Sequence, residues 1–216
     1  MSKYTTVIWD LDGTLLYTLT DLMNAVNSAL KKYGYPEHDL EFIRKAVGNG
    51  VKKLMELSIP DGLSNPDYDR AYEAFNLFYK EHDLDNTKPY DGIPSAVEKL
   101  RECGVKQAIV SNKIDYAVKR LNDSFFRMEC AIGTQDGLRR KPDADMVLKA
   151  MEELGADRER TVYVGDSEVD IATAKNAGLP CISVLWGFRS KEELMPYKPQ
   201  LLAEDTDELL KLVLGE

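Results

Sequence analysis

The chain has 216 residues, of which 44% are hydrophobic and 30% charged, and this balance is typical of a folded protein rather than a disordered one. The formal net charge of -9 repels a polyanion at long range, which argues against a nucleic acid partner. Asp10 and Asp12 interrupt the first apolar stretch, so neither a signal peptide nor a membrane span is predicted.

The chain begins with one predicted strand and continues with a purely helical stretch. Residues 6–9 are apolar and β-branched, which indicates a buried strand. From about residue 16 to residue 89 only helical patterns follow, at 21–33, 51–57 and 68–79. A helical stretch inserted between two strands of one sheet predicts a second, small domain. We therefore expect a catalytic core formed by 1–15 and 90–216, and a helical cap domain at 16–89.

Strands and helices alternate in the rest of the chain. Apolar runs at 108–110, 130–132, 162–164 and 181–185 predict strands, and helical patterns at 95–103, 143–154 and 170–177 alternate with the strands. Such alternation implies a parallel sheet with helices on both faces. The predicted fold class is therefore α/β, a three-layer doubly wound parallel sheet (Rossmann-like core) with an inserted small α-helical cap domain.

The three cysteines suggest a reducing compartment. Cys103, Cys130 and Cys181 are odd in number and lack CxxC or metal-finger spacing. Cys130 and Cys181 lie in or beside apolar runs, so buried free thiols are expected. A cytoplasmic location fits this pattern.

Two acidic motifs follow predicted strands. Asp10 and Asp12 come directly after the first strand, and side chains two apart in an extended segment point the same way. Two like charges about 4 Å apart repel by roughly 4 kcal/mol at an effective dielectric near 20, so such a pair needs a cation or a shared proton. Asp166 follows another strand, and Asp170 lies one helical turn beyond it. Oxygen ligands gathered in this way suit Mg²⁺, although turn formation and N-capping also explain these residue types.

Two further segments offer groups that bind phosphate. Ser111 and Asn112 follow the second core strand, where a hydroxyl and backbone N–H groups can donate to phosphate oxygens, although an N-cap explains them equally well. Lys141 belongs to the only compact basic cluster and precedes a predicted helix. The only histidines, His38 and His82, fall in the helical insert, so no Ser-His-Asp triad or histidine metal site is apparent.

In their order along the chain, these motifs resemble those of the haloacid dehalogenase superfamily. The helical insert, with Val47-Gly48-Asn49-Gly50, Pro89-Tyr90-Asp91-Gly92 and Trp186-Gly187, is similar to the phosphoglycolate phosphatase-like branch. The superfamily motifs are matched by Asp10-Leu11-Asp12-Gly13-Thr14, Ser111-Asn112, Lys141-Pro142 and Gly165-Asp166-Ser167 through Asp170.

The resemblance implies a Mg²⁺-dependent phosphatase that acts on a small phosphomonoester. Asp10 would be the nucleophile that becomes an aspartyl phosphate, and Asp12 would protonate the leaving oxygen and then activate water. The resemblance also implies that Ser111, Asn112 and Lys141 bind the phosphate. Mg²⁺ would be bound by Asp10, the backbone carbonyl of Asp12 and Asp166. Asp170 would bind the ion directly or through water, or would support the site.

Several alternatives remain open at this point. A phosphomutase of the β-phosphoglucomutase type would use the same core, and pyrophosphate or a nucleotide is also an eligible substrate. A phosphoacceptor receiver domain shares the residue types, but it generally lacks the helical insert and the second Asp of Asp-x-Asp. 2-Phosphoglycolate is the leading substrate, with Arg44, Asn49 and Lys52 as candidate selectivity residues. Tyr17-Thr18 stands where many members of the branch carry Asp-Ser, which leaves the substrate open.

Overall fold

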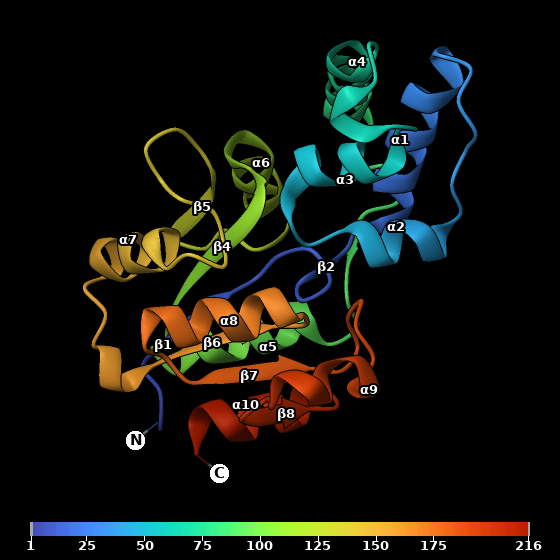
Figure 1. Ribbon diagram of the computed structural model, residues 1–216. Coiled ribbons are helices and arrows are strands. Elements are labelled where there is room, and N and C mark those ends of the chain that lie inside the picture. Colours follow the sequence, from blue (N-terminus) through green and yellow to red (C-terminus); the bar gives the residue numbers. More distant parts are fainter. Residues whose placement is uncertain (1, 216) are drawn as a thin grey trace. The chain divides into compact units, whose positions relative to one another are not determined.

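The computed structural model describes residues 2–215 and divides the chain into two compact units (Figure 1). The core unit comprises Met1–Leu16 and Pro89–Glu216, and the helical unit comprises Tyr17–Lys88. Two short strands, β2 (Leu16–Tyr17) and β3 (Lys88–Pro89), pair where the chain passes from one unit to the other.

The core unit is built on one parallel sheet. Its strand order is β5-β4-β1-β6-β7-β8, and every pair of neighbouring strands is parallel. The central strand β1 is fully buried, which agrees with its apolar sequence. The strands span Thr6–Trp9 (β1), Lys106–Ile114 (β4), Cys130–Thr134 (β5), Thr161–Gly165 (β6), Cys181–Val184 (β7) and Leu201–Ala203 (β8).

Helices lie on both sides of this sheet (Figure 1). The helix α7 packs beside α8 and against β4 and β5, whereas α5 packs beside α10 and against β4. The predicted three-layer α/β fold is thereby confirmed. The core helices span Ile93–Glu102 (α5), Asp115–Phe125 (α6), Asp145–Leu154 (α7), Glu168–Ala177 (α8), Lys191–Leu194 (α9) and Thr206–Leu214 (α10), with short 3-10 turns at Arg158–Arg160 and Met195–Tyr197.

The two faces of β1 are distinguished by alternate residues. Ile8 belongs to the apolar cluster under α7 and α8. The next residue, Trp9, donates from Nε1 to Oε1 of Gln107 at 3.2 Å, and Nε2 of Gln107 donates to the Val97 carbonyl oxygen of α5 at 2.9 Å. Because side chains alternate along a strand, a one-residue slip of β1 would exchange these environments, so the register of β1 is strongly determined.

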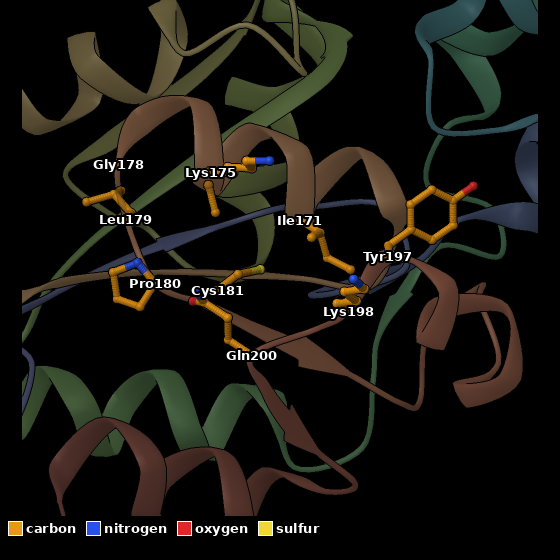
Figure 2. Close-up of a pocket in the computed structure, with 10 residues that line it drawn as sticks. Ile171, Lys175, Gly178, Leu179, Pro180, Cys181, Tyr197, Lys198 and Gln200 are labelled. Carbon is orange, nitrogen blue, oxygen red and sulfur yellow. The ribbon is translucent and has the colours of Figure 1, made fainter.

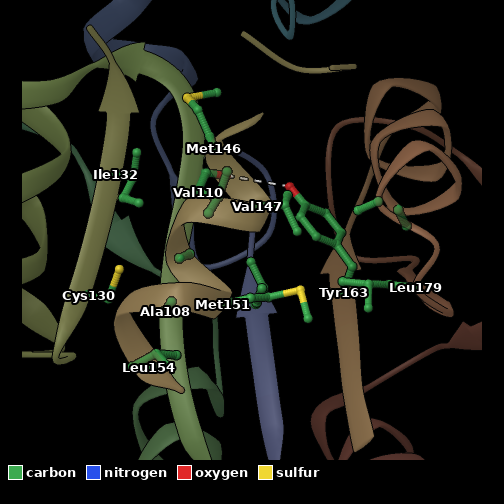
Figure 3. Packing of buried hydrophobic residues seen from close by; sticks show 14 of the residues in the cluster. Ala108, Val110, Cys130, Ile132, Met146, Val147, Met151, Leu154, Tyr163 and Leu179 are labelled. Atoms are coloured by element: carbon green, nitrogen blue, oxygen red, sulfur yellow. Dashed lines mark hydrogen bonds between the residues drawn. The ribbon is translucent and has the colours of Figure 1, made fainter. Parts of the chain in front are cut away.

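An apolar cluster packs α7 against the sheet (Figure 3). Burying each aliphatic or methionine side chain contributes about 1.5 to 3 kcal/mol. Strand residues such as Val110 and Tyr163 meet the inner face of α7, which carries Met146, Val147, Ala150, Met151 and Leu154. Lys141 lies four residues before α7, so this packing anchors the loop that presents it.

The helical unit contains four α-helices within residues 17–88, and the longest two pack together. Ala25, Val26 and Ala29 on α1 are buried, as are Ala71 and Phe75 on α4, which is the helical spacing expected of one apolar face. These helices are α1 (Leu19–Lys32), α2 (Leu40–Ala46), α3 (Gly50–Ser58) and α4 (Tyr68–His82), with a 3-10 turn at Gly62–Ser64.

A buried carboxylate ties the beginning of the helical unit to its end. Asp21 in the first turn of α1 accepts hydrogen bonds from the backbone N–H groups of Asn86 at 3.0 Å and Thr87 at 2.8 Å. The side chains of Asn86 and Thr87 donate to it as well, each at 2.8 Å. Asp21 therefore joins the two ends of the unit through one side chain.

Candidate active site

The predicted site residues of the core unit gather at the carboxyl end of the parallel sheet. Asp10 directly follows β1, and Asp166 directly follows the neighbouring strand β6. Ser111, Asn112 and Lys113 form the last part of β4 on the other side of β1. Since the chain adds strands on one side of β1 and then on the other, this edge is a topological switch point, where open α/β sheets bind ligands.

Three buried carboxylates form the centre of the site. One oxygen each from Asp10, Asp166 and Asp170 lie within 4.8 Å of one another. Burial, followed by the charges of Asp170 and Asp166, raises the pKa of Asp10 well above its ordinary value, although Lys141 opposes the shift. Burial and the Asp170 carboxylate raise the pKa of Asp166 to about 7. Burial is the largest cause of both shifts, and the neighbouring carboxylates add to it.

One buried ammonium group joins two of these carboxylates. Lys141 Nζ donates to Asp10 Oδ1 at 2.7 Å, to Asp170 Oδ1 at 2.8 Å and to the Tyr163 hydroxyl at 3.0 Å. Burial disfavours the charged form of Lys141, but Asp10 and Asp170 outweigh that effect and raise its pKa well above the ordinary value. One positive charge among three carboxylates leaves a surplus that a divalent cation would neutralise.

Asp166 is held rigidly from two loops. Thr14 Oγ1 donates to one carboxylate oxygen at 3.1 Å, and the Phe188 backbone N–H donates to the other at 2.7 Å. Gly13 and Gly187 pack directly against this side chain: a Cβ built on Gly13 would lie 2.5 Å from Asp166 Oδ2, and one on Gly187 would lie 2.6 Å from the same atom. Only glycine allows both loops to approach so closely.

Asp170 uses both carboxylate oxygens within the protein. Its Oδ2 accepts from the Ser167 backbone N–H at 3.1 Å and from the Ser167 hydroxyl at 2.6 Å, in the capping box that begins α8. Its Oδ1 accepts from Lys141 and, at 3.2 Å, from the Tyr163 hydroxyl. These contacts suit a residue that positions Lys141, which in turn contacts Asp10.

The side chain of Asp12 lies outside this carboxylate cluster and contacts a second lysine. Lys113 Nζ lies 2.8 Å from one Asp12 carboxylate oxygen and 3.1 Å from the other. Only 2% of the Lys113 side chain is exposed, against 15% for Asp12. The sequence does not single out Lys113, because β4 is irregular between Val110 and Ile114 and strand alternation therefore does not fix the direction of its side chain.

Ser111 and Asn112 are both buried, and they make different contacts. The hydroxyl oxygen of Ser111 accepts from the Lys113 backbone N–H at 3.2 Å. The Asn112 side chain donates to the Lys141 carbonyl oxygen at 3.0 Å, and the backbone carbonyl oxygen of Asn112 accepts from Thr134 Oγ1 at 3.0 Å. Asn112 therefore links the end of β4 to the loop that carries Lys141.

The three selectivity candidates belong to the helical unit. Arg44 forms a two-bond ion pair with Glu41 on the same helix, α2, at 2.9 and 3.0 Å. Asn49 is the N-cap residue of α3, and Lys52 lies in the first turn of that helix. The Arg44 side chain therefore has a local structural role within the unit.

A separate cavity of about 590 Å³ opens beside α8 (Figure 2). Within the described residues, its lining includes none of the site residues named above. The lining comprises Ile171, Ala174, Lys175, Gly178, Leu179, Pro180, Cys181, Tyr197, Lys198 and Gln200. It is therefore distinct from the carboxylate cluster.

The fold and the site define a class of α/β enzyme that binds its ligand at the carboxyl edge of a parallel sheet among buried acidic groups and lysine. The sequence pattern of haloacid dehalogenase-like hydrolases matches residues 7–184. The chain belongs to this family, in its phosphoglycolate phosphatase-like branch, and it is a phosphoric monoester hydrolase.

Individual relatives agree with this assignment. The phosphoglycolate phosphatase of Aquifex aeolicus is 32% identical over 195 residues, which cover 88% of this chain and 89% of the relative. That of Pseudomonas putida is 34% identical over 215 residues, with coverage of 94% and 78%. A solved protein from Lactobacillus delbrueckii subsp. bulgaricus is 34% identical, with a TM-score of 0.94 and 100% coverage of both chains.

Two smaller predictions also have an outcome. Cys130 and Cys181 are buried free thiols, as expected, whereas Cys103 is exposed. Among residues 2–215, no helix combines the length and the apolar character that a membrane crossing requires.

Proposed function

We propose that the enzyme is a Mg²⁺-dependent phosphatase that hydrolyses a small phosphomonoester through an aspartyl phosphate at Asp10. The observation that carries this proposal is the Asp10 carboxylate, which lies 2.7 Å from Lys141 Nζ and within 4.8 Å of Asp166 and Asp170 oxygens. Such a site holds a nucleophile, an ammonium group for a phosphoryl oxygen, and a place for a cation beside one another.

The donor set fits magnesium. Asp10, Asp166 and the backbone carbonyl of Asp12 would hold the ion, and Asp170 would support it through its contact with Lys141. All these donors are oxygens, which Mg²⁺ prefers, and burial together with the neighbouring carboxylates raises the pKa values of Asp10 and Asp166. When bound, the ion supplies the positive charge that lets an anionic carboxylate meet an anionic phosphate.

Two displacements complete the reaction. In the first, an Asp10 carboxylate oxygen forms a bond to phosphorus while the bond from phosphorus to the ester oxygen breaks, and Asp12 gives its proton to that oxygen. In the second, water attacks phosphorus, Asp12 takes a proton from the water, and the bond to Asp10 breaks to release phosphate. Lys141 and Ser111 would hold phosphoryl oxygens during both steps, and Asn112 would act at the phosphate and through the loop of Lys141.

2-Phosphoglycolate is the proposed substrate, because the two relatives described above are phosphoglycolate phosphatases. Residues 16–89 are proposed to be a helical cap domain, which in this architecture covers the leaving group. The partner is then a small phosphorylated metabolite.

The test is a panel of phosphate esters assayed with Mg²⁺ and with EDTA. Phosphoglycolate, sugar phosphates, nucleotides and pyrophosphate are compared by phosphate release, and sugar phosphates also by isomerisation. We expect the highest kcat/KM for phosphoglycolate, loss of turnover in EDTA and its return with Mg²⁺. Asp10→Asn should be inactive, whereas Asp123→Asn, on the exposed side of α6, should keep the wild-type activity. Isomerisation without phosphate release, or turnover in EDTA, would contradict the proposal.

A further inference from the structure

Lys113 is a buried charge that the carboxylate cluster does not explain. That cluster already has Lys141, which contacts Asp10 and Asp170. Lys113 instead contacts the Asp12 carboxylate. Burying an ammonium group is costly, so a lysine at this point of the sheet calls for a specific reason.

The position of Lys113 follows from the contact with Asp12. In the proposed reaction, one Asp12 oxygen meets the ester oxygen of the leaving group. Lys113 Nζ lies 2.8 and 3.1 Å from the two Asp12 oxygens. Two hydrogen bonds in succession span about 5.5 Å, so Nζ lies within about that distance of the ester oxygen, beside the leaving group rather than the transferred phosphoryl group.

We propose that Lys113 determines substrate specificity by binding an anionic group on the leaving alcohol, next to the ester oxygen. This inference rests on the proposed function. In 2-phosphoglycolate a single methylene carbon separates the ester oxygen from a carboxylate, which places that carboxylate within reach of Nζ. An ammonium group carries three N–H donors and can share them between Asp12 and a substrate carboxylate.

The inference predicts selection for a class of substrate, the phosphate esters of 2-hydroxy acids. An ester with a neutral group in the place of the carboxylate would leave the Lys113 charge without its substrate partner. A hydrogen bond between charged groups of this kind corresponds to about a 10- to 100-fold preference.

A matched pair of substrates tests this directly. 2-Phosphoglycolate and 2-hydroxyethyl phosphate differ only in a carboxylate against a hydroxymethyl group, and kcat/KM is measured for both with Mg²⁺. We expect the wild type to prefer phosphoglycolate, and Lys113→Met to lower the ratio of the two values at least 10-fold. Lys113→Arg should keep most of the preference, because it retains the charge.

Two further variants separate the proposal from simpler effects. Lys99→Met removes an exposed lysine of α5 and should keep the wild-type ratio. Lys113→Gln keeps a donor for Asp12 but lacks the charge, so it should also lower the ratio. It provides the test if Lys113→Met fails to fold.

The outcomes are distinguishable. An equal loss on both substrates, or an unchanged ratio, in Lys113→Gln or a folded Lys113→Met would overturn the role of Lys113 and leave the proposed function intact. A wild-type enzyme that hydrolyses other phosphate esters but neither of this pair would overturn phosphoglycolate as the substrate and this role with it.

Discussion

Without Mg²⁺, the protein should lose stability as the pH rises from about 5 to about 8, and Asp166→Asn should remove much of that loss. Burial and the Asp170 carboxylate raise the pKa of Asp166 from 3.8 to about 7 in the folded protein. The folded state therefore binds this proton more tightly than the unfolded state. The resulting stabilisation is complete below the unfolded pKa and is lost as the pH passes through about 7. An increase from 3.8 to about 7 corresponds to on the order of 4 kcal/mol in all, of which roughly 3 kcal/mol is lost above pH 5.

The asparagine variant is a fair comparison because it can keep both contacts. Its carbonyl oxygen can accept from the Phe188 N–H, and its amide can donate to the Thr14 hydroxyl oxygen. The assay is urea unfolding in EDTA at a series of pH values, with Asp123→Asn as the control for a lost surface charge. Equal pH slopes of the free energy of unfolding for wild type and Asp166→Asn would refute the reasoning. Mg²⁺ should stabilise the wild type more at pH 8 than at pH 5, since binding requires the deprotonated carboxylate.

Three other substitutions have defined outcomes. Gly187→Ala should destabilise the protein by about 1 to 3 kcal/mol and weaken stabilisation by Mg²⁺ in thermal unfolding, since its Cβ would lie 2.6 Å from Asp166 Oδ2. Asp21→Ala should cost about 2 to 4 kcal/mol in urea unfolding and reduce hydrogen-exchange protection at Thr87, which loses two hydrogen bonds, whereas unchanged protection would contradict that role. Lys141→Met should lower kcat by about 10²- to 10³-fold. It should also destabilise the protein more at pH 8 than at pH 5, because protonation at the lower pH neutralises the carboxylates that have lost Lys141. An equal loss of unfolding free energy at both pH values would contradict this.

The parts of the fold that the sequence predicts are those with a strong local pattern. The strand expected at 6–9 is β1 as observed, and α7 ends at Leu154, before Gly155 with positive φ, as the glycine stop signal indicates. The edge strand β8 was not predicted, because it has only three residues and is defined by backbone pairing with β7. The helix α6 was missed because it follows β4 without an intervening loop and has no side-chain cap.

The candidate site divides in a similar way. Parallel strands that are neighbours must end at one edge, so the sequence alone predicts that Asp10 and Asp166 approach each other. Contacts that depend on a side chain's direction could not be foreseen. They include the pairing of Lys113 with Asp12, the hydrogen bond from Tyr163 to Asp170 and the Phe188 N–H on Asp166.

The most direct test of the mechanism is to find the phosphorylated residue. The enzyme is mixed with phosphoglycolate and Mg²⁺, quenched in acid during turnover and reduced with borohydride, which converts an aspartyl phosphate to homoserine. Peptide mass spectrometry should then find homoserine at position 10, and only when both substrate and Mg²⁺ were present. Full turnover with Asp10 unmodified, or with the label on another residue, would contradict the account.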